Sequence, residues 1–181
     1  MEITTPLDEK SISKLKAGDN VELSGIIYTA RDAAHSRLTD LINKEKKLPI
    51  PLQGQVIYYV GPAPAPPGKI IGSAGPTTSY RMDSFTPLLL KKGLKGMIGK
   101  GKRSEKVKNA IKKYKGIYLA AVGGAAALIA KSIKSVEIVA YPDLGPEAIR
   151  RLEIESMPLI VINDIYGNDL YEIALNNNSL S

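Results

Sequence analysis

The hydrophobic pattern of the chain switches repeatedly between strand-like and helix-like spacing, which is typical of an α/β fold. Alternating or continuous apolar runs predict strands at residues 20–29, 55–60, 69–73, 95–99, 117–122, 135–140 and 158–163. Helical spacing predicts helices at residues 32–46, 82–92 and 104–114, a short helix opened by Gly123 and Gly124, and a helical stretch at 146–152. Gly167 and Asn168 then predict a turn into a final hairpin strand at 169–173.

The composition is ordinary for a globular protein, with 44% hydrophobic and 24% charged residues in 181. A chain of this length can bury a sizeable core, so we expect one domain at residues 1–175 and a frayed tail at 176–181. The first residues show no secretory pattern, and the longest apolar stretch, residues 117–130, is too short to cross a bilayer. We therefore expect a soluble, cytoplasmic protein that spans no membrane.

The chain contains no cysteine and a single histidine, His35. The missing thiols exclude disulfides, a cysteine nucleophile and thiolate ligands to a metal or cluster. One histidine cannot build a metal site alone. Any chemistry must therefore use hydroxyls, carboxylates and cations, or a cofactor held by another chain.

The net charge of +7 is concentrated in residues 91–115, which carry +10 against −3 for the remainder. This segment indicates nucleic-acid binding, an electropositive approach for a small anion, or the solvated face of an amphipathic helix. Val107, Ala110 and Ile111 follow helical spacing between the lysines, which favours the solvated helix for most of them. Nucleic-acid binding is disfavoured because Tyr114 is the only aromatic residue in the segment.

The segment Gly75-Pro-Thr-Thr-Ser-Tyr-Arg-Met-Asp83 carries the most information about function. It lies between a predicted strand and a predicted helix, where backbone N–H groups point outward and favour an anion. Arg81 can bind a carboxylate through two nitrogens, with Thr77, Thr78 and Ser79 beside it. The alternative is that these hydroxyls only cap the helix. One hydroxyl would suffice for a cap, so the segment favours an anion site.

Two further segments place cations where strands end. Arg31 stands between a predicted strand and helix, with His35 one turn later. This pair could bind an anion. The alternative explains it equally well: Asp32 caps the helix, and His35 is an ordinary core or surface histidine.

Lys100 lies between Gly99 and Gly101, and flanking glycines let a ligand approach and leave the ammonium accessible. The spacing is not that of a phosphate-binding P-loop.

Taken together and in this order, the motifs resemble the β subunit of two-subunit class I fumarate hydratases and L-tartrate dehydratases over nearly the whole chain. The matching segments are Leu15-Lys-Ala-Gly-Asp19, Thr29-Ala-Arg-Asp-Ala-Ala-His35, Tyr58-Tyr-Val-Gly-Pro62, Gly75-Pro-Thr-Thr-Ser79, Arg81-Met-Asp83, Gly99-Lys-Gly101, Gly123-Gly-Ala-Ala-Ala-Leu128 and Val161-Ile-Asn-Asp164.

The resemblance implies a swivelling β/β/α domain with a central mixed sheet flanked by helices. It also implies an α subunit, joined in an α2β2 heterotetramer, whose three cysteines hold a [4Fe-4S] cluster with one open iron. This chain itself would bind no cofactor and no metal. The implied reaction is the reversible hydration of fumarate to (S)-malate, with L-tartrate dehydration as the alternative.

The resemblance also assigns roles at matching positions. Thr77 would be the base that removes the proton next to the carboxylate, and Arg31 would activate it. The residues that would bind the dicarboxylate are Arg31, Thr78, Arg81 and Lys100. His35, which would orient Arg31 or the start of the helix, and Asp83 would lie behind them. A regulatory chain without an active-site role is disfavoured because the cations stand at predicted strand ends, where open α/β sheets bind ligands.

Overall fold

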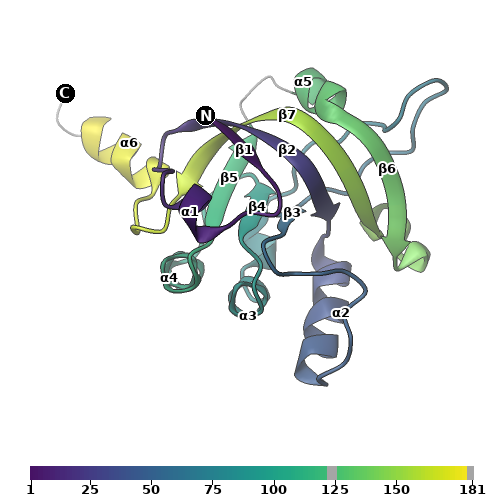
Figure 1. The fold of residues 1–181 in the computed structure, drawn as a ribbon, viewed down its shortest axis with the longest axis horizontal. Helices are drawn as coiled ribbons and strands as arrows, with labels where there is room; N and C mark the ends of the chain where they lie inside the picture. The colour runs from purple at the N-terminus through teal and green to yellow at the C-terminus, as the bar shows by residue number, and fades with distance from the viewer. Residues whose placement is uncertain (122–125, 179–181) are drawn as a thin grey trace.

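The computed structural model describes residues 1–121 and 126–178, and Figure 1 shows their arrangement. The strands are β1 (Glu2–Thr4), β2 (Asn20–Thr29), β3 (Val56–Tyr58), β4 (Gly96–Gly99), β5 (Ile117–Ala121), β6 (Ile133–Ala140) and β7 (Ile149–Asn163). The helices are α1 (Glu9–Ile12), α2 (Asp32–Asn43), α3 (Thr86–Lys91), α4 (Glu105–Tyr114), α5 (Ala126–Ser132) and α6 (Leu170–Asn178), with 3-10 turns η1 (Ser79–Met82) and η2 (Pro142–Glu147).

The strands form one mixed sheet in the order β1-β2-β3-β4-β5-β7-β6. Strands β1 to β5 are parallel to their neighbours, whereas β7 runs antiparallel to β5 and β6. The long strand β7 also pairs with β2, and this pairing closes β2, β3, β4, β5 and β7 into a small barrel. The predicted mixed α/β class is therefore confirmed, while the closure of the sheet is a feature that periodicity did not reveal.

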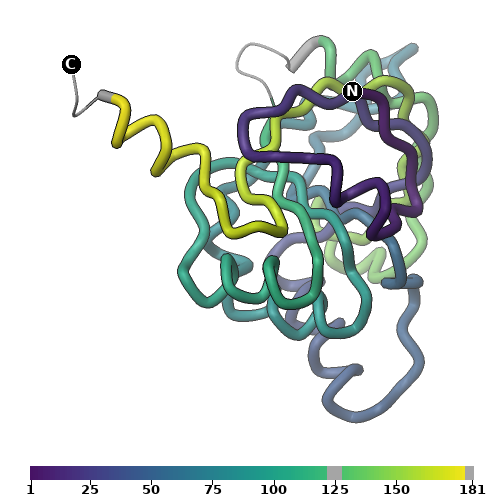
Figure 2. The backbone as a smooth tube through the Cα atoms, turned by 60° about the vertical axis from the view of Figure 1, so that its left-hand side comes forward, coloured from purple at the N-terminus to yellow at the C-terminus, as the bar shows by residue number. Residues whose placement is uncertain are grey.

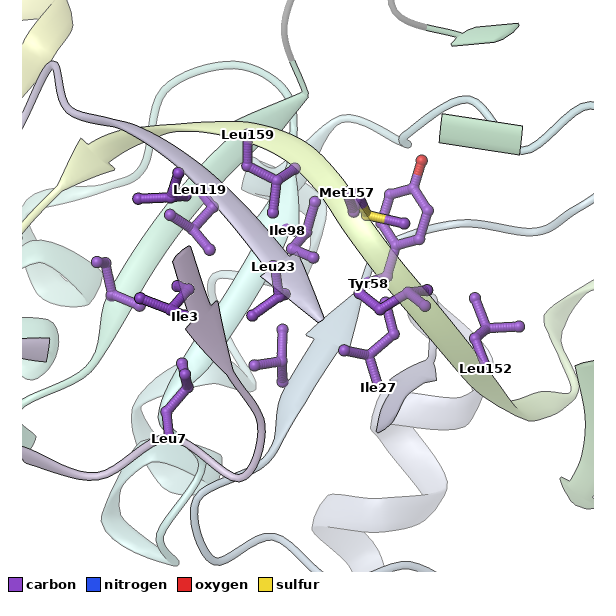
Figure 3. Close-up of a cluster of buried hydrophobic side chains, with 14 of the residues drawn as sticks. Ile3, Leu7, Leu23, Ile27, Tyr58, Ile98, Leu119, Leu152, Met157 and Leu159 are labelled. Atoms are coloured by element: carbon purple, nitrogen blue, oxygen red, sulfur yellow. The ribbon is translucent and has the colours of Figure 1, made fainter. Parts of the chain in front are cut away.

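The barrel interior holds one hydrophobic core, and the outer face of the parallel strands carries a second. Figure 3 shows the interior, where side chains from different strands meet; among them are Ile3, Leu23, Ile27, Tyr58, Ile98, Leu119, Leu152, Met157 and Leu159. Buried residues of α2, α3 and α4, such as Leu38, Leu89 and Ile111, pack in the second cluster with Ile57 and Met97 of the sheet. The parallel strands β3, β4 and β5 are thus buried on both faces, as their nearly continuous apolar sequences require.

The lysine-rich helix forms where its spacing predicts it, and the structure adds a cap at each end. The Ser104 hydroxyl accepts from the backbone N–H of Val107 at 3.4 Å, and Lys115 ends α4 in the left-handed conformation before Gly116. By contrast, the predicted helix at 82–92 begins only at Thr86, after η1 and a turn at residues 83–85, because Pro87 in the first turn of α3 favours a helix start there.

Three predicted elements are wrong. Residues 149–152 of the predicted helical stretch belong to β7, because β2 and β6 pair with this segment and override its local spacing. Residues 69–73 are not a strand but part of a loop that folds back on itself, with Ser73 O accepting from Ala63 N at 3.0 Å. The final hairpin is reduced to one bridge between Asn163 and Asp169, and Asp169 then caps α6 by accepting from Tyr171 N at 2.9 Å.

The ends of the chain differ from the expected pattern in smaller ways. β1 and α1 were not predicted, and α2 ends at Asn43 rather than at residue 46. Helix α6 extends away from the body of the molecule in Figure 2 and runs to Asn178, into the segment expected to be frayed. The turn at Gly123 and Gly124 and residues 179–181 lie outside the described residues. No helix among the described residues is long and apolar enough to cross a membrane.

Candidate functional site

The carboxyl ends of parallel strands β2, β3 and β4 share one edge of the sheet, and residues 75–83 cross this edge. Next to the end of β3, the backbone N–H of Thr77 donates to Tyr59 O at 2.6 Å. At the end of β4, Thr78 forms a parallel bridge with Lys100, and Ser79 N donates to Lys100 O at 2.9 Å. The backbone therefore holds the hydroxyl-bearing segment against two strand ends.

A side-chain contact attaches the same segment to the third strand end. Arg81 Nε donates to Asp32 Oδ1 at 3.0 Å, and Asp32 follows directly after Arg31 at the junction of β2 and α2. The Arg31 side chain passes over Gly61, where an added Cβ would lie 2.9 Å from Nη1. The structure thus brings Arg31, Thr77 and Arg81 to the sheet edge where the sequence placed them.

The candidate ligand-binding side chains on this edge are at least partly exposed to solvent. Thr78 and Lys100 are exposed, Thr77 is half-buried, and their side chains make no hydrogen bond or ion pair with any described residue. The Arg81 side chain is 48% exposed and that of Arg31 is 24% exposed. The edge consequently presents three cations, and two hydroxyls that bond to nothing in the described part of the chain.

His35 is completely buried one turn into α2 and supports the backbone of Arg31. Its Nδ1 lies 2.8 Å from Arg31 O, and a carbonyl can only accept, so the neutral ring carries its proton on Nδ1. The ring packs edge-on against Tyr59 with ring centroids 5.3 Å apart. Burial lowers the pKa of His35 to about 4. His35 therefore contacts the backbone at the start of α2, and its orienting role stays a prediction.

Arg103 is the residue that sequence reasoning missed, because it was counted with the surface lysines around it. Its side chain is fully buried, and Nε donates to Asp83 Oδ1 at 2.7 Å. Nη2 donates to the Thr86 hydroxyl at 2.7 Å, and the guanidinium carbon lies 5.3 and 5.0 Å from the ring centroids of Tyr59 and Tyr118. Asp83, predicted to lie behind the site, is therefore one anchor of a buried cation.

Further bonds extend this network to both ligand-bearing loops. Asp83 Oδ2 accepts from Ser104 N at 2.6 Å. The Tyr118 hydroxyl lies 2.8 Å from the Ser79 hydroxyl and donates to Gly101 O at 2.9 Å. Burial raises the pKa of the Tyr118 phenol, which keeps it neutral as a structural donor. Residues 75–83 and 99–104 are thus held in one fixed arrangement.

Gly99 and Gly101, which were expected to let a ligand approach, instead serve backbone packing and a turn. A Cβ on Gly99 would lie 1.8 Å from Ser79 Oγ, so Gly99 is needed for the approach of residues 75–83 and not of a ligand. Gly101 has a φ of 85°, which favours glycine at the turn after Lys100. The exposed Lys100 ammonium agrees with the expectation, but its accessibility comes from the position of the turn.

The site is an open edge rather than a closed pocket. Five hollows of 350 to 630 Å³ on the described surface are lined by other residues, and none of them includes Thr77, Arg81 or Lys100. Within residues 1–121 and 126–178, no three His, Asp or Glu side chains gather closely enough to hold a metal ion. The functional groups that the described residues place at this edge are cations and hydroxyls.

Residues 1–174 match the family model described as "Fumarase C-terminus". The chain is 41% identical over 180 residues to "Fumarate hydratase class I, anaerobic" of Escherichia coli strain K12, covering 97% of this chain and 33% of that protein. It is 39% identical over 179 residues to "Fumarate hydratase 2" of Leishmania major, covering 97% of this chain and 32% of that protein.

A third relative has nearly the length of this chain. The chain is 41% identical over 172 residues to "Putative L(+)-tartrate dehydratase subunit beta" of Methanocaldococcus jannaschii, covering 92% of this chain and 88% of that protein. The chain thus spans about a third of the length of the two fumarate hydratases and most of the relative named as a subunit.

We predict that His35 makes the stability of the chain depend on pH below neutrality. Its pKa rises from about 4 in the folded chain to the ordinary 6.5 on unfolding, so the unfolded state takes up a proton first as the pH falls. The free energy of unfolding should therefore fall by about 2 kcal/mol from pH 7 to pH 5 because of this residue. Urea unfolding of the chain and of His35→Gln at both pH values measures the difference. Equal losses in the two proteins would contradict the burial of a neutral histidine.

Proposed function

The chain belongs to the family of class I fumarase C-terminal domains and tartrate dehydratase β subunits, and from this premise we propose that it is the β subunit of a two-subunit hydro-lyase that interconverts fumarate and (S)-malate. One observation carries the proposal: three cations and two hydroxyls that bond to no described residue gather from separate segments on one open sheet edge. A small dianion needs such a set, because its charges are costly to bury without partners.

The proposed enzyme needs an α subunit. The chain spans a third of the fumarate hydratases but most of the relative named as a β subunit, which supports a partner that provides the remaining part. Class I fumarate hydratases depend on an iron–sulfur cluster, and this chain does not fit such a group because it has no cysteine to ligate it. We assign the [4Fe-4S] cluster to the α subunit, in an α2β2 assembly in which the β domain swivels.

The cations have distinct roles in substrate binding. Arg31 and Arg81 each offer two terminal nitrogens, which match the two oxygens of a carboxylate. Lys100 adds a compact ammonium from the end of β4, and the Thr78 hydroxyl beside it adds a hydrogen bond. The open geometry supports a site that is completed when the α subunit covers this edge and excludes water, which strengthens each of these contacts.

Thr77 is the proposed base that removes the proton from the carbon next to the carboxylate. Its side chain makes no hydrogen bond within residues 1–121 and 126–178, and its backbone is fixed by the bond to Tyr59 O. A neutral hydroxyl is too weak a base, so it needs a cation that stabilises the oxygen as its proton departs. Arg31 at the same edge is the candidate for this role, and the α subunit would receive the proton.

L-Tartrate dehydration is the second candidate function, and the similarity to the tartrate dehydratase relative favours it. Both substrates are dicarboxylates, so the same cations serve either one.

Nucleic-acid binding has less support, because Lys108 on the basic helix α4 is already paired with Asp169 at 3.6 Å and with Glu105 at 2.5 Å. The cytoplasmic location remains a prediction.

The experiment that tests the function is co-expression with the cluster-bearing partner, anaerobic purification, and assay on both substrates. We expect the complex to hydrate fumarate and the purified chain alone to be inactive, because it has no cysteine for the cluster. Activity confined to L-tartrate would replace the first substrate by the second. Inactivity of the cluster-loaded complex on both, or malate formation by the chain alone, would contradict the assignment.

We predict that Thr77→Ala lowers kcat of the complex by about 10²–10⁴-fold with little change in KM, because it removes the group that acts on the reacting proton. Thr77→Ser restores the hydroxyl and should retain most of the turnover. The neighbouring Thr78→Ala is the matched control and should change mainly KM. If Thr77→Ala turns over at nearly the normal rate, the base lies elsewhere, and a group of the α subunit takes its place.

A further inference from the structure

Three arginines around the candidate site share one pattern of contacts. Each has a carboxylate oxygen beside its Nε. Asp32 at 3.0 Å from Arg81 and Asp83 at 2.7 Å from Arg103 accept hydrogen bonds, whereas Glu147 at 3.3 Å from Arg31 makes an ion pair without hydrogen-bond alignment. Arg103 also uses its terminal nitrogens inside the protein. The terminal nitrogens of Arg31 and Arg81, in contrast, make no hydrogen bond to any described residue. A contact at Nε leaves the two-nitrogen end of the guanidinium for a ligand.

The carboxylate beside Arg31 comes from a distant part of the chain. Glu147 ends η2, while Arg31 follows β2. Glu147 Oε1 makes the ion pair with Arg31, and Oε2 accepts from the backbone N–H of Ala33 at 3.3 Å. One carboxylate therefore contacts both the side chain of Arg31 and the first turn of the helix that follows it. The two partners are about three-quarters buried, so this pair is less screened than a surface pair.

The surrounding contacts fix Glu147 in place. The Thr29 hydroxyl donates to Ala148 O at 3.3 Å and accepts from Arg150 N at 3.0 Å, which ties the residues after Glu147 to the end of β2. On the other side, Arg37 of α2 donates through both terminal nitrogens to Asp143 of η2, at 3.0 and 2.6 Å. Glu147 thus lies in a turn that is bonded to both β2 and α2, and this placement favours one direction for the Arg31 guanidinium.

We propose that Glu147 is a positioning residue that holds Arg31 with its terminal nitrogens directed toward the substrate carboxylate. The identity of the ligand rests on the proposed function. The ordering of Arg31 by Glu147 is independent of that function. Arginine side chains have several rotatable bonds, and ordering one before the substrate arrives lowers the entropic cost of binding. Glu147 therefore preorganises the site without touching the substrate.

Asp143→Asn provides a matched control, because it breaks the other ion pair between η2 and α2 and leaves Arg31 untouched. In the assembled enzyme, we expect Glu147→Ala to lower kcat/KM for fumarate by about tenfold or more, mainly through KM, and Asp143→Asn to stay within about twofold. Glu147→Gln keeps an oxygen acceptor beside Arg31 Nε and Ala33 N, and should recover part of the loss. Equal effects of Glu147→Ala and Asp143→Asn would show that Glu147 only holds η2 in place.

A second readout is independent of activity. Nitrogen-15 relaxation of the Arg31 Nε–Hε group, assigned with Arg31→Lys, reports whether the side chain is ordered in the full chain. We expect order in the wild type and in Asp143→Asn, and loss of order in Glu147→Ala. Unchanged order in Glu147→Ala would overturn the proposal. Lost order together with a complex that is inactive on dicarboxylates would leave the positioning role standing and refute the proposed function instead.

Discussion

The buried guanidinium of Arg103 is the constraint on which the candidate site depends. An unpaired charge in the interior is strongly unfavourable, so the segments that surround Arg103 must supply partners with good geometry. Asp83 and Thr86 do so with hydrogen bonds of 2.7 Å, and Tyr59 and Tyr118 place their rings beside the cation. Because these partners come from β5, the end of β3 and the start of α3, satisfying one charge fixes the relative positions of all three.

The position of the ligand-bearing groups follows from that constraint. Closure of the barrel by β7 gives rigid strands, and the network then attaches residues 75–83 and 99–104 to their carboxyl ends. The cations fall into two classes as a result. Arg103 uses its hydrogen-bond donors inside the protein, whereas Arg31, Arg81 and Lys100 lie at the edge of the sheet. This division separates the cations of the proposed anion site from those of the lysine-rich helix.

Much of the fold could be predicted from sequence where local pattern and tertiary pairing agree. Strand β2 and helix α4 were placed well, because alternation in one and amphipathic spacing in the other match their final environments. The segment 149–152 was misjudged because pairing with both β2 and β6 outweighs its local spacing. Family membership was also predicted correctly from motifs in order, although the roles of the site residues remain predictions.

The residues at the candidate site could be predicted only where their position follows from strand order rather than from tertiary packing. The placement of Arg31, Thr77 and Lys100 at one edge could be predicted because parallel strands bring their carboxyl ends together, while their roles stay predictions. Arg103 was hidden by ten other basic residues in the segment 91–115, and only burial distinguishes it from them. Glu147 follows no motif, and its contact with Arg31 depends on how η2 packs on α2.

The most direct measurement of the central claim compares Arg103→Lys with Lys102→Arg in the assembled enzyme. Lysine keeps the buried charge but cannot bond Asp83 and Thr86 together in the same plane, whereas Lys102 is exposed and adjacent. The account predicts that Arg103→Lys folds, as judged by far-ultraviolet circular dichroism, and loses about tenfold or more in kcat/KM for the dicarboxylate, while Lys102→Arg is unchanged. A folded Arg103→Lys enzyme with the kcat/KM of the wild type would contradict it.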